Sequence, residues 1–117
     1  MTRTLAGRAA LITGANQGLG LAIARAYVEM GASVMLCARD ERLLAEAQAG
    51  LSALARGSQR VLAAPADVSD PASVRDVVQQ TLAAFPQVHA LVNNAGIYGP
   101  KGAIEDAGLS KDDIDGY

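Results

Sequence analysis

The chain has 117 residues, of which 50% are hydrophobic but only 3% aromatic, and its formal net charge is −2. Its charged residues are scattered, which excludes the basic stripe of a nucleic-acid-binding protein, and no segment reaches the roughly 18 uncharged apolar residues of a membrane span. The apolar run at residues 9–12 is too short for a signal peptide, so we expect one cytoplasmic domain. Cys37, the only cysteine, fits a reducing compartment, and its apolar neighbours predict a buried packing residue.

Short β-like runs alternate with longer helical patterns along the chain. Strands are predicted at residues 9–13, 33–38, 61–65 and 88–93, and helices at 18–30, at 41–56 and from Asp70-Pro71 onward. The stretch 94–109 is predicted to be a loop, and a further helix is predicted to begin at Ser110. This alternation is typical of parallel βαβ units. It predicts an α/β fold of the Rossmann type, a doubly wound parallel sheet with helices on both faces.

Apolar residues at three- and four-residue steps indicate which face of each predicted helix is buried. In the first helix these residues are Leu19, Ile23, Ala26, Tyr27 and Met30. In the second they are Leu44, Ala47, Leu51 and Leu54, and in the third Val74, Val77, Val78, Leu82 and Phe85. Gly31 is the expected stop of the first helix, and Asp70 is the expected N-cap of the third.

A glycine-rich turn, Thr13-Gly14-Ala15-Asn16-Gln17-Gly18-Leu19-Gly20, connects the first strand to the first helix. Glycines suit a tight turn in which a pyrophosphate approaches the backbone and the helix packs close to the strand. The free N–H groups of the helix N-terminus would then bind the phosphates. An NTPase phosphate-binding loop is excluded, because Leu21-Ala22 stands where that loop needs Lys and then Ser or Thr. A methyltransferase site and a purely structural turn are the alternatives.

The spacing of Gly14, Gly18 and Gly20 resembles the T-G-x-x-x-G-x-G motif of the short-chain dehydrogenase/reductase family. Asp67-Val68, after the third strand, and Asn93-Asn94-Ala95-Gly96, at the end of the fourth, resemble two further motifs of that family. The resemblance implies a nicotinamide-dependent oxidoreductase that transfers a hydride to or from a small carbonyl or alcohol substrate. It also implies the strand order 3-2-1-4 and, for the full-length protein, a homo-oligomer, either a dimer or a tetramer.

The resemblance further implies which residues bind the cofactor. The turn residues that would line the phosphates and the adenosine ribose are Gly14, Asn16, Gln17, Gly18, Leu19 and Gly20. Asp67 would accept a hydrogen bond from the adenine amino group, and Val68 would pack on the ring. Asn94 would lie near the adenosine ribose, with Ala95 and Gly96 in the same motif. The alternatives are a helix-cap role for Asp67 and, for Asn93 and Asn94, turn-forming side chains bonded to their own backbone.

The end of the second strand bears on the choice between the two nicotinamide cofactors. An acidic residue there would bind the ribose 2′-hydroxyl and favour NAD, but alignment with the family gives Ala38 at that position, followed by Arg39. A guanidinium can bind a 2′-phosphate in a bidentate, charge-assisted way, which favours NADP over NAD. Gln17 weakens this prediction, since its position is often basic in NADP-preferring members. Asp40 is expected either to repel phosphate or to cap the second helix.

The tyrosine, lysine, serine and asparagine that carry out catalysis in the family have no counterpart here, so we predict no catalytic residue and no metal site. Tyr27 and Tyr98 are each followed four residues later by glycine, and Tyr117 is the last residue. His89 is expected to be structural or exposed. The chain is therefore expected to be the cofactor-binding half of a longer enzyme, truncated after the fourth strand and inactive alone. The alternative is a non-catalytic nucleotide-binding or sensor module.

Overall fold

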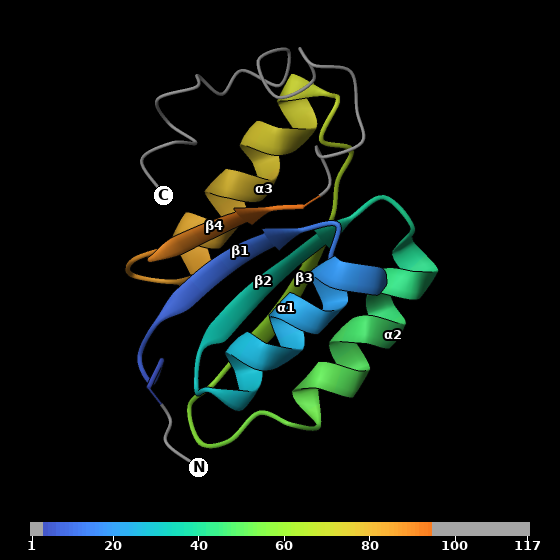
Figure 1. The fold of residues 1–117 in the computed structure, drawn as a ribbon. Coiled ribbons are helices and arrows are strands. Elements are labelled where there is room, and N and C mark those ends of the chain that lie inside the picture. Colours follow the sequence, from blue (N-terminus) through green and yellow to red (C-terminus); the bar gives the residue numbers. More distant parts are fainter. Residues whose placement is uncertain (1–3, 95–117) are drawn as a thin grey trace.

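The computed structural model of the chain describes residues 4–94, in which strands and helices alternate in sequence (Figure 1). The strands are β1 (Ala9–Thr13), β2 (Ser33–Ala38), β3 (Val61–Pro65) and β4 (Ala90–Asn93). The helices are α1 (Gly18–Glu29), α2 (Glu41–Ser52) and α3 (Pro71–Ala84). The loop and helix predicted beyond Asn94 lie outside the described residues.

The strands form one parallel sheet in the order β3-β2-β1-β4, as predicted. The central strand β1 pairs with both of its neighbours, so that Leu11 lies opposite Met35 of β2 and Leu91 of β4. Helices α1 and α2 cover one face of the sheet and α3 covers the other (Figure 1). The predicted Rossmann-type doubly wound arrangement is therefore confirmed for the described residues.

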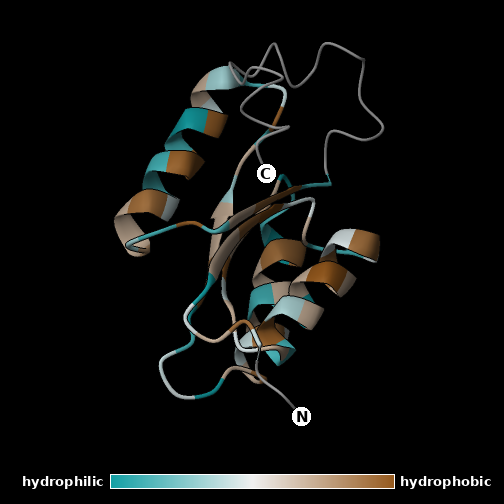
Figure 2. Cartoon of the chain, turned by 60° about the vertical axis from the view of Figure 1, so that its left-hand side comes forward, coloured by the Kyte–Doolittle hydropathy of each residue, from teal (hydrophilic) through white to brown (hydrophobic). Residues whose placement is uncertain are grey.

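The side chains of β1 and β2 alternate between two hydrophobic clusters, one on each face of the sheet. Ile12 and Leu36 face α1 and α2, whereas Leu11 and Cys37 face α3. Burial on both faces explains why these strands are continuous apolar runs, and α3 turns its hydrophobic residues toward the sheet (Figure 2). Cys37 is buried, as predicted, and burial raises the pKa of its thiol to about 11.

The predicted buried face of α1 is wrong in part. Leu19 and Met30 are 62% and 36% exposed, and Ala26 is also exposed. The residues that are buried instead lie at four-residue steps and are mostly small: Gly20, Ala24 and Val28. Small side chains let the helix axis approach the sheet closely, and the larger apolar residues are left at the sides of the contact or in solvent.

The second and third helices also differ from the prediction in detail. Helix α2 ends at Ser52 rather than at 56, because the N–H of Leu54 bonds to Leu51 in a tighter turn; Leu54 is 36% exposed. In α3, Leu82 is 57% exposed, and Thr81 is buried in its place. The Thr81 hydroxyl donates to the Val77 carbonyl at 2.7 Å, which makes its burial inexpensive.

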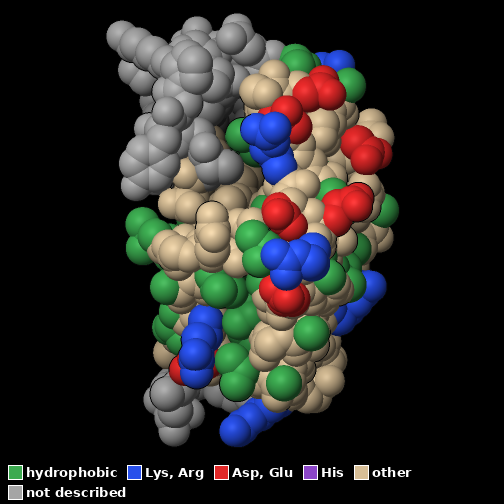
Figure 3. All heavy atoms as spheres, turned by 90° about the vertical axis from the view of Figure 1, so that its right-hand side faces the viewer, with side chains coloured by type: hydrophobic (Ala, Val, Ile, Leu, Met, Phe, Trp, Pro, Cys, Tyr) green, Lys and Arg blue, Asp and Glu red, His purple; other side chains and the backbone are tan. Residues whose placement is uncertain are grey.

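The surface of the described residues shows no concentration of one charge on the face that carries α1 and α2, where acidic and basic side chains are interspersed (Figure 3). Two of the ion pairs there join side chains one helical turn apart, Arg25 with Glu29 and Arg42 with Glu46. Within residues 4–94, no helix has the length and apolar character needed to cross a membrane.

Candidate functional site at the carboxyl edge of the sheet

The parallel strands bring their carboxyl ends to the same edge of the sheet, and the residues singled out by sequence follow those ends (Figure 1). Gly14 follows β1, Arg39 follows β2, Asp67 lies two residues beyond β3, and Asn94 follows β4. In open α/β sheets, ligands bind in the crevice at this edge, where the strand order reverses. Ala95 and Gly96 lie outside the described residues.

The glycine turn needs glycine at two positions for its backbone conformation. Gly14 has φ 62° and Gly18 has φ 59°, in the left-handed region that side chains with a Cβ rarely adopt. The N–H of Ala15 donates to the carbonyl of Cys37 at 3.3 Å, which ties the turn to β2. Gln17 and Leu19 are exposed along the turn, so both are open to a ligand.

Gly20 is needed for a different reason, because there is no room for a side chain at this position. A Cβ built on Gly20 would collide with the carbonyl oxygen of Gly14 and would lie 2.9 Å from Nδ2 of Asn94. The Asn94 amide in turn donates to the Gly14 carbonyl at 3.4 Å. The start of α1, the turn and the end of β4 therefore meet at a point where only a glycine fits, as the close-packing role of the third glycine predicts.

The N-terminus of α1 lacks the side-chain cap that α2 and α3 have. Asp40 accepts a hydrogen bond from the N–H of Leu43 at the start of α2, and Asp70 accepts one from Ala72 at the start of α3. At the same position before α1, Gln17 is extended and its side chain makes no capping hydrogen bond. The first N–H groups of α1 and the positive end of its dipole thus suit an anion better than those of α2 or α3. Of the two roles expected for Asp40, the structure supports the capping role.

The asparagines at the end of β4 make contacts distant in sequence. The Thr13 hydroxyl donates to Oδ1 of Asn93 at 3.2 Å, joining the ends of β1 and β4, and the Asn94 amide reaches the Gly14 carbonyl. These contacts differ from the local side-chain-to-backbone turns considered as the alternative. Asn93 thus links β4 to β1, which agrees with the structural role expected for it.

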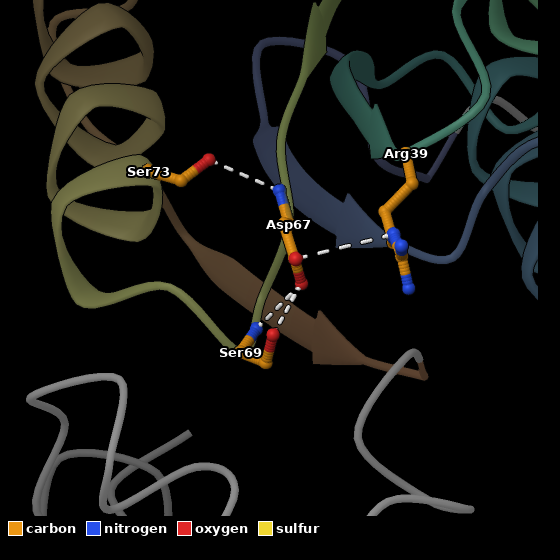
Figure 4. Close-up of polar contacts among 4 residues, drawn as sticks. All are labelled: Arg39, Asp67, Ser69 and Ser73. Carbon is orange, nitrogen blue, oxygen red and sulfur yellow. Dashed lines mark hydrogen bonds and ion pairs between the residues drawn. The ribbon is translucent and has the colours of Figure 1, made fainter.

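Asp67 is held from two directions, by Ser69 ahead of α3 and by Ser73 in the first turn of α3 (Figure 4). Its Oδ1 accepts from the Ser69 hydroxyl at 2.6 Å and from the Ser69 N–H at 2.9 Å, while its own N–H donates to Oγ of Ser73 at 3.0 Å. The hydroxyl and then the N–H of Ser69 hold the pKa of Asp67 below its ordinary value, with a smaller effect from Arg39. The helix-cap role is wrong for Asp67, because Asp70 caps α3.

Arg39 lies beside Asp67, with its Nε 4.0 Å from Oδ2 of the carboxylate (Figure 4). The Arg39 side chain is 79% exposed, so the guanidinium is open to a ligand. Both residues line an open cavity of about 450 Å³, together with Glu41, Pro65 and Ala66. Ala38, at the position where an acidic residue would favour NAD, is buried and brings no charge to this cavity.

Sequence reasoning missed three residues of this region: Glu41, Ser69 and Ser73. The pattern Asp67-Val68-Ser69 could have revealed one of them, since an aspartate commonly accepts from the N–H two residues later. The positions of Glu41 and Ser73 depend on how α2 and α3 pack beside the strand ends, which short-range spacing does not specify.

His89 lies at the opposite, amino-terminal edge of the sheet. The Nδ1 of its ring accepts a hydrogen bond from the backbone N–H of Ala9 at 3.1 Å, and the backbone N–H of His89 donates to the Ala9 carbonyl at 2.8 Å. This agrees with the structural role predicted for it. Among the described residues, no group of three or more His, Cys, Asp and Glu side chains is arranged to hold a metal ion.

The fold and this edge together define a Rossmann-type α/β domain with a glycine turn at the carboxyl edge of its sheet, the edge where sheets of this type bind ligands. The family model described as short chain dehydrogenase matches residues 8–115. The chain belongs to the short-chain dehydrogenase/reductase family. Membership in this family removes the methyltransferase interpretation of the glycine turn.

Three similar proteins illustrate the relationship. A short chain dehydrogenase/reductase of Macrophomina phaseolina, dpmpG, is 46% identical over 93 residues, which are 80% of this chain and 52% of the relative. The structure of L-sorbose reductase from Gluconobacter frateurii, complexed with NADPH and L-sorbose, has TM-score 0.75 and 38% identity, covering 82% of this chain and 36% of that one. A short chain dehydrogenase/reductase from Burkholderia phymatum in complex with NAD has TM-score 0.69 and 34% identity, with coverages of 75% and 30%. The chain thus spans between about a third and a half of these proteins.

Proposed function

We propose that this chain is the cofactor-binding half of an NADP-preferring oxidoreductase, which transfers a hydride between the nicotinamide and a carbonyl or alcohol substrate. Membership in the family supports the reaction class. L-sorbose reductase, a structural neighbour, was solved with NADPH, and another neighbour was solved with NAD, which together support a nicotinamide cofactor.

The observation that carries the proposal is the cradle formed by the glycine turn and the start of α1. Gly18 has a positive φ, Gly20 has no room for a Cβ, and no side chain caps the helix. Backbone N–H groups at such a helix start suit a pyrophosphate. The turn residues proposed to hold the phosphates and the adjoining ribose are Gly14, Asn16, Gln17, Gly18, Leu19 and Gly20.

The adenosine is proposed to lie across the ends of β3 and β4. The Asp67 carboxylate would accept from the adenine amino group, Val68 would pack on the ring, and Asn94, with Ala95 and Gly96 in the same motif, would lie near the ribose. Asp67 and Val68 are each half-buried and so have surface left for a ligand. The lowered pKa of Asp67 keeps its carboxylate ionised, which suits it as a hydrogen-bond acceptor.

The preference for NADP rests on Arg39. Its side chain is exposed beside a cavity of about 450 Å³, and the preceding Ala38 offers no carboxylate for a ribose 2′-hydroxyl. A guanidinium binds phosphate through paired, charge-assisted hydrogen bonds. Asp40 caps α2 and is not among the residues that line this cavity.

Catalysis needs residues that this chain does not contain. The nicotinamide cofactor supplies or accepts the hydride when bound, and a proton must reach or leave the substrate oxygen as charge develops there. No tyrosine in the sequence is followed four residues later by lysine, the pair that serves this purpose in the family. We therefore expect the 117-residue chain alone to be inactive, and we expect the full-length protein to contain a Tyr-x-x-x-Lys motif. A full-length protein without that motif would favour the non-catalytic sensor alternative.

The test of the NADP preference is Arg39→Ala in the full-length protein, with the affinities for NADPH and NADH measured by titration. Loss of a charged hydrogen bond is worth roughly 1.5–3 kcal/mol, so NADPH binding should weaken about ten- to a hundred-fold while NADH binding stays nearly unchanged. Arg42→Ala is the matched control, because Arg42 is also exposed but pairs with Glu46 on α2. Equal losses for both cofactors would refute the 2′-phosphate role.

A further inference from the structure

The cavity proposed to receive the 2′-phosphate has one cationic residue and two acidic ones in its lining, namely Arg39, Glu41 and Asp67. On charge alone, both carboxylates should oppose a phosphate. Their contacts differ, however. Asp67 is 4.0 Å from Arg39 and is hydrogen-bonded to Ser69, whereas no ion pair is recorded for Glu41 within residues 4–94.

The Asp67 carboxylate is held in place by hydrogen bonds, whereas the neighbouring Arg39 has a long side chain with many rotamers. Its Oδ1 takes two hydrogen bonds from Ser69 and its backbone N–H is bonded to Ser73, so Oδ2 is held in a set direction (Figure 4). Arginine has many rotamers, and an exposed one loses considerable conformational entropy when it binds a ligand. The Asp67 carboxylate, with Oδ2 4.0 Å from Nε, favours those conformations of Arg39 that keep the guanidinium beside it.

The contact between Arg39 and Asp67 leaves the terminal nitrogens of the guanidinium available for a ligand. The Arg39 atom paired with Asp67 is Nε, at 4.0 Å from Oδ2, and not one of the terminal nitrogens (Figure 4). A guanidinium carries five N–H donors, so engagement at Nε still permits a two-point contact between the other nitrogens and a phosphate.

We propose that Asp67 is a positioning residue for cofactor choice: through Nε it holds Arg39 in the conformation that receives the 2′-phosphate of NADP. The inference rests on the proposed function, since it requires that this edge binds the cofactor. It gives Asp67 a role that is separate from any contact with adenine. It also predicts opposite effects for the two carboxylates of the cavity, because Glu41 contributes repulsion without positioning Arg39.

The experiment compares Asp67→Asn with Glu41→Gln in the full-length protein, measuring dissociation constants for NADPH and NADH. Each variant removes one negative charge from the same cavity, and asparagine keeps an oxygen that can accept from Ser69. We expect Asp67→Asn to weaken NADPH binding about two- to five-fold and Glu41→Gln to strengthen it by a similar factor, the range typical of exposed charge pairs. NADH binding should change little in Glu41→Gln. In Asp67→Asn it should weaken less than NADPH binding does, because loss of the proposed adenine contact affects both cofactors whereas the position of Arg39 matters only for the 2′-phosphate.

A double-variant comparison shows whether Asp67 acts through Arg39. In an Arg39→Ala background, Asp67→Asn should weaken NADPH binding no more than it weakens NADH binding, because there is no guanidinium to position and only the adenine contact is lost. Ser69→Ala, which keeps the charge of Asp67 but removes the 2.6 Å hydrogen bond, should weaken NADPH binding in the same direction and by less. Thermal unfolding of each variant verifies that it is folded.

Two results would overturn the inference while leaving the proposed function intact. If Asp67→Asn strengthens NADPH binding as Glu41→Gln does, Asp67 acts only by its charge. If it weakens NADPH and NADH equally, with Arg39 present or absent, Asp67 serves the adenine and does not position Arg39. Failure of the wild-type protein to bind either nucleotide would instead refute the proposed function, and the inference with it.

Discussion

Replacing Gly20 with alanine should destabilise the protein, although the same change in an ordinary helix stabilises it. Alanine is favoured over glycine inside a helix by about 1 kcal/mol. At Gly20 the added Cβ would collide with the Gly14 carbonyl oxygen, and it would lie 2.7 Å from the Gly14 carbonyl carbon and 2.9 Å from the Asn94 amide. Two of these atoms belong to the backbone and cannot rotate away.

The magnitude follows from the two opposing contributions. Overpacking by one carbon in a close contact typically costs about 1–3 kcal/mol, and the upper end applies where backbone must move. Subtracting the helix gain leaves a net loss of about 2 kcal/mol in the free energy of unfolding. NADPH affinity should fall as well, because the shift needed to relieve the contact displaces the turn or Asn94.

Gly50→Ala is the matched control for this measurement. Gly50 lies in α2, and a Cβ there would meet nothing within 4 Å, so the variant should gain roughly 0.5–1 kcal/mol. The assay is urea unfolding of the full-length wild-type protein and both variants, followed by circular dichroism, together with NADPH titration. A Gly20→Ala protein as stable as Gly50→Ala, with unchanged NADPH binding, would refute the close-contact argument.

The remaining predictions concern a helix cap, a buried thiol and a carboxylate. Asp70→Ala should lower the free energy of unfolding by about 1 kcal/mol in urea, because Asp70 caps α3. Asp76→Ala, on the exposed side of the same helix, should change it by no more than about 0.5 kcal/mol. Equal effects of the two variants would refute the capping role. Cys37, buried and with its pKa raised to about 11, should resist alkylation at pH 8 until the protein is unfolded, and rapid labelling of the native protein would contradict this. The pKa of Asp67 is lower in the folded protein than in the unfolded chain, where it is about 4. Ionisation of Asp67 therefore stabilises the fold at pH values above about 4, and this stabilisation is lost as the pH falls through the folded-state pKa. The stability difference between wild type and Asp67→Asn should therefore narrow in acid; a difference that is constant from pH 7 to pH 2 would contradict the shift.

Sequence alone predicted the bounds of β1, β2 and β3 and the order of the sheet. These strands are continuous apolar runs, and β1 is followed directly by Gly14, so short-range sequence is enough to predict where they lie. The buried face of α1 could not be predicted in the same way. Periodicity predicts burial of the largest apolar residues, such as Leu19 and Met30. Where α1 lies closest to the sheet, however, the buried residue is Ala24, which has a small side chain.

The sequence predicted which residues form the candidate site, but not the contacts between them. Motif spacing located the glycine turn, Arg39 and Asp67, because each follows a strand end at a fixed distance. The pairing of Arg39 with Asp67 and the presence of Glu41 in the same cavity depend on the relative positions of β2, α2 and β3. Such contacts between distant segments have no signature in local spacing.

The location of the cofactor is tested most directly by a crystal structure of the full-length protein with NADPH. We expect the pyrophosphate against the turn from Gly14 to Gly20 and the start of α1, with the 2′-phosphate in contact with the Arg39 guanidinium. A nucleotide bound at the opposite edge, near His89, would contradict the location of the site. A nucleotide at the predicted edge whose 2′-phosphate points into solvent would contradict the basis given for NADP preference.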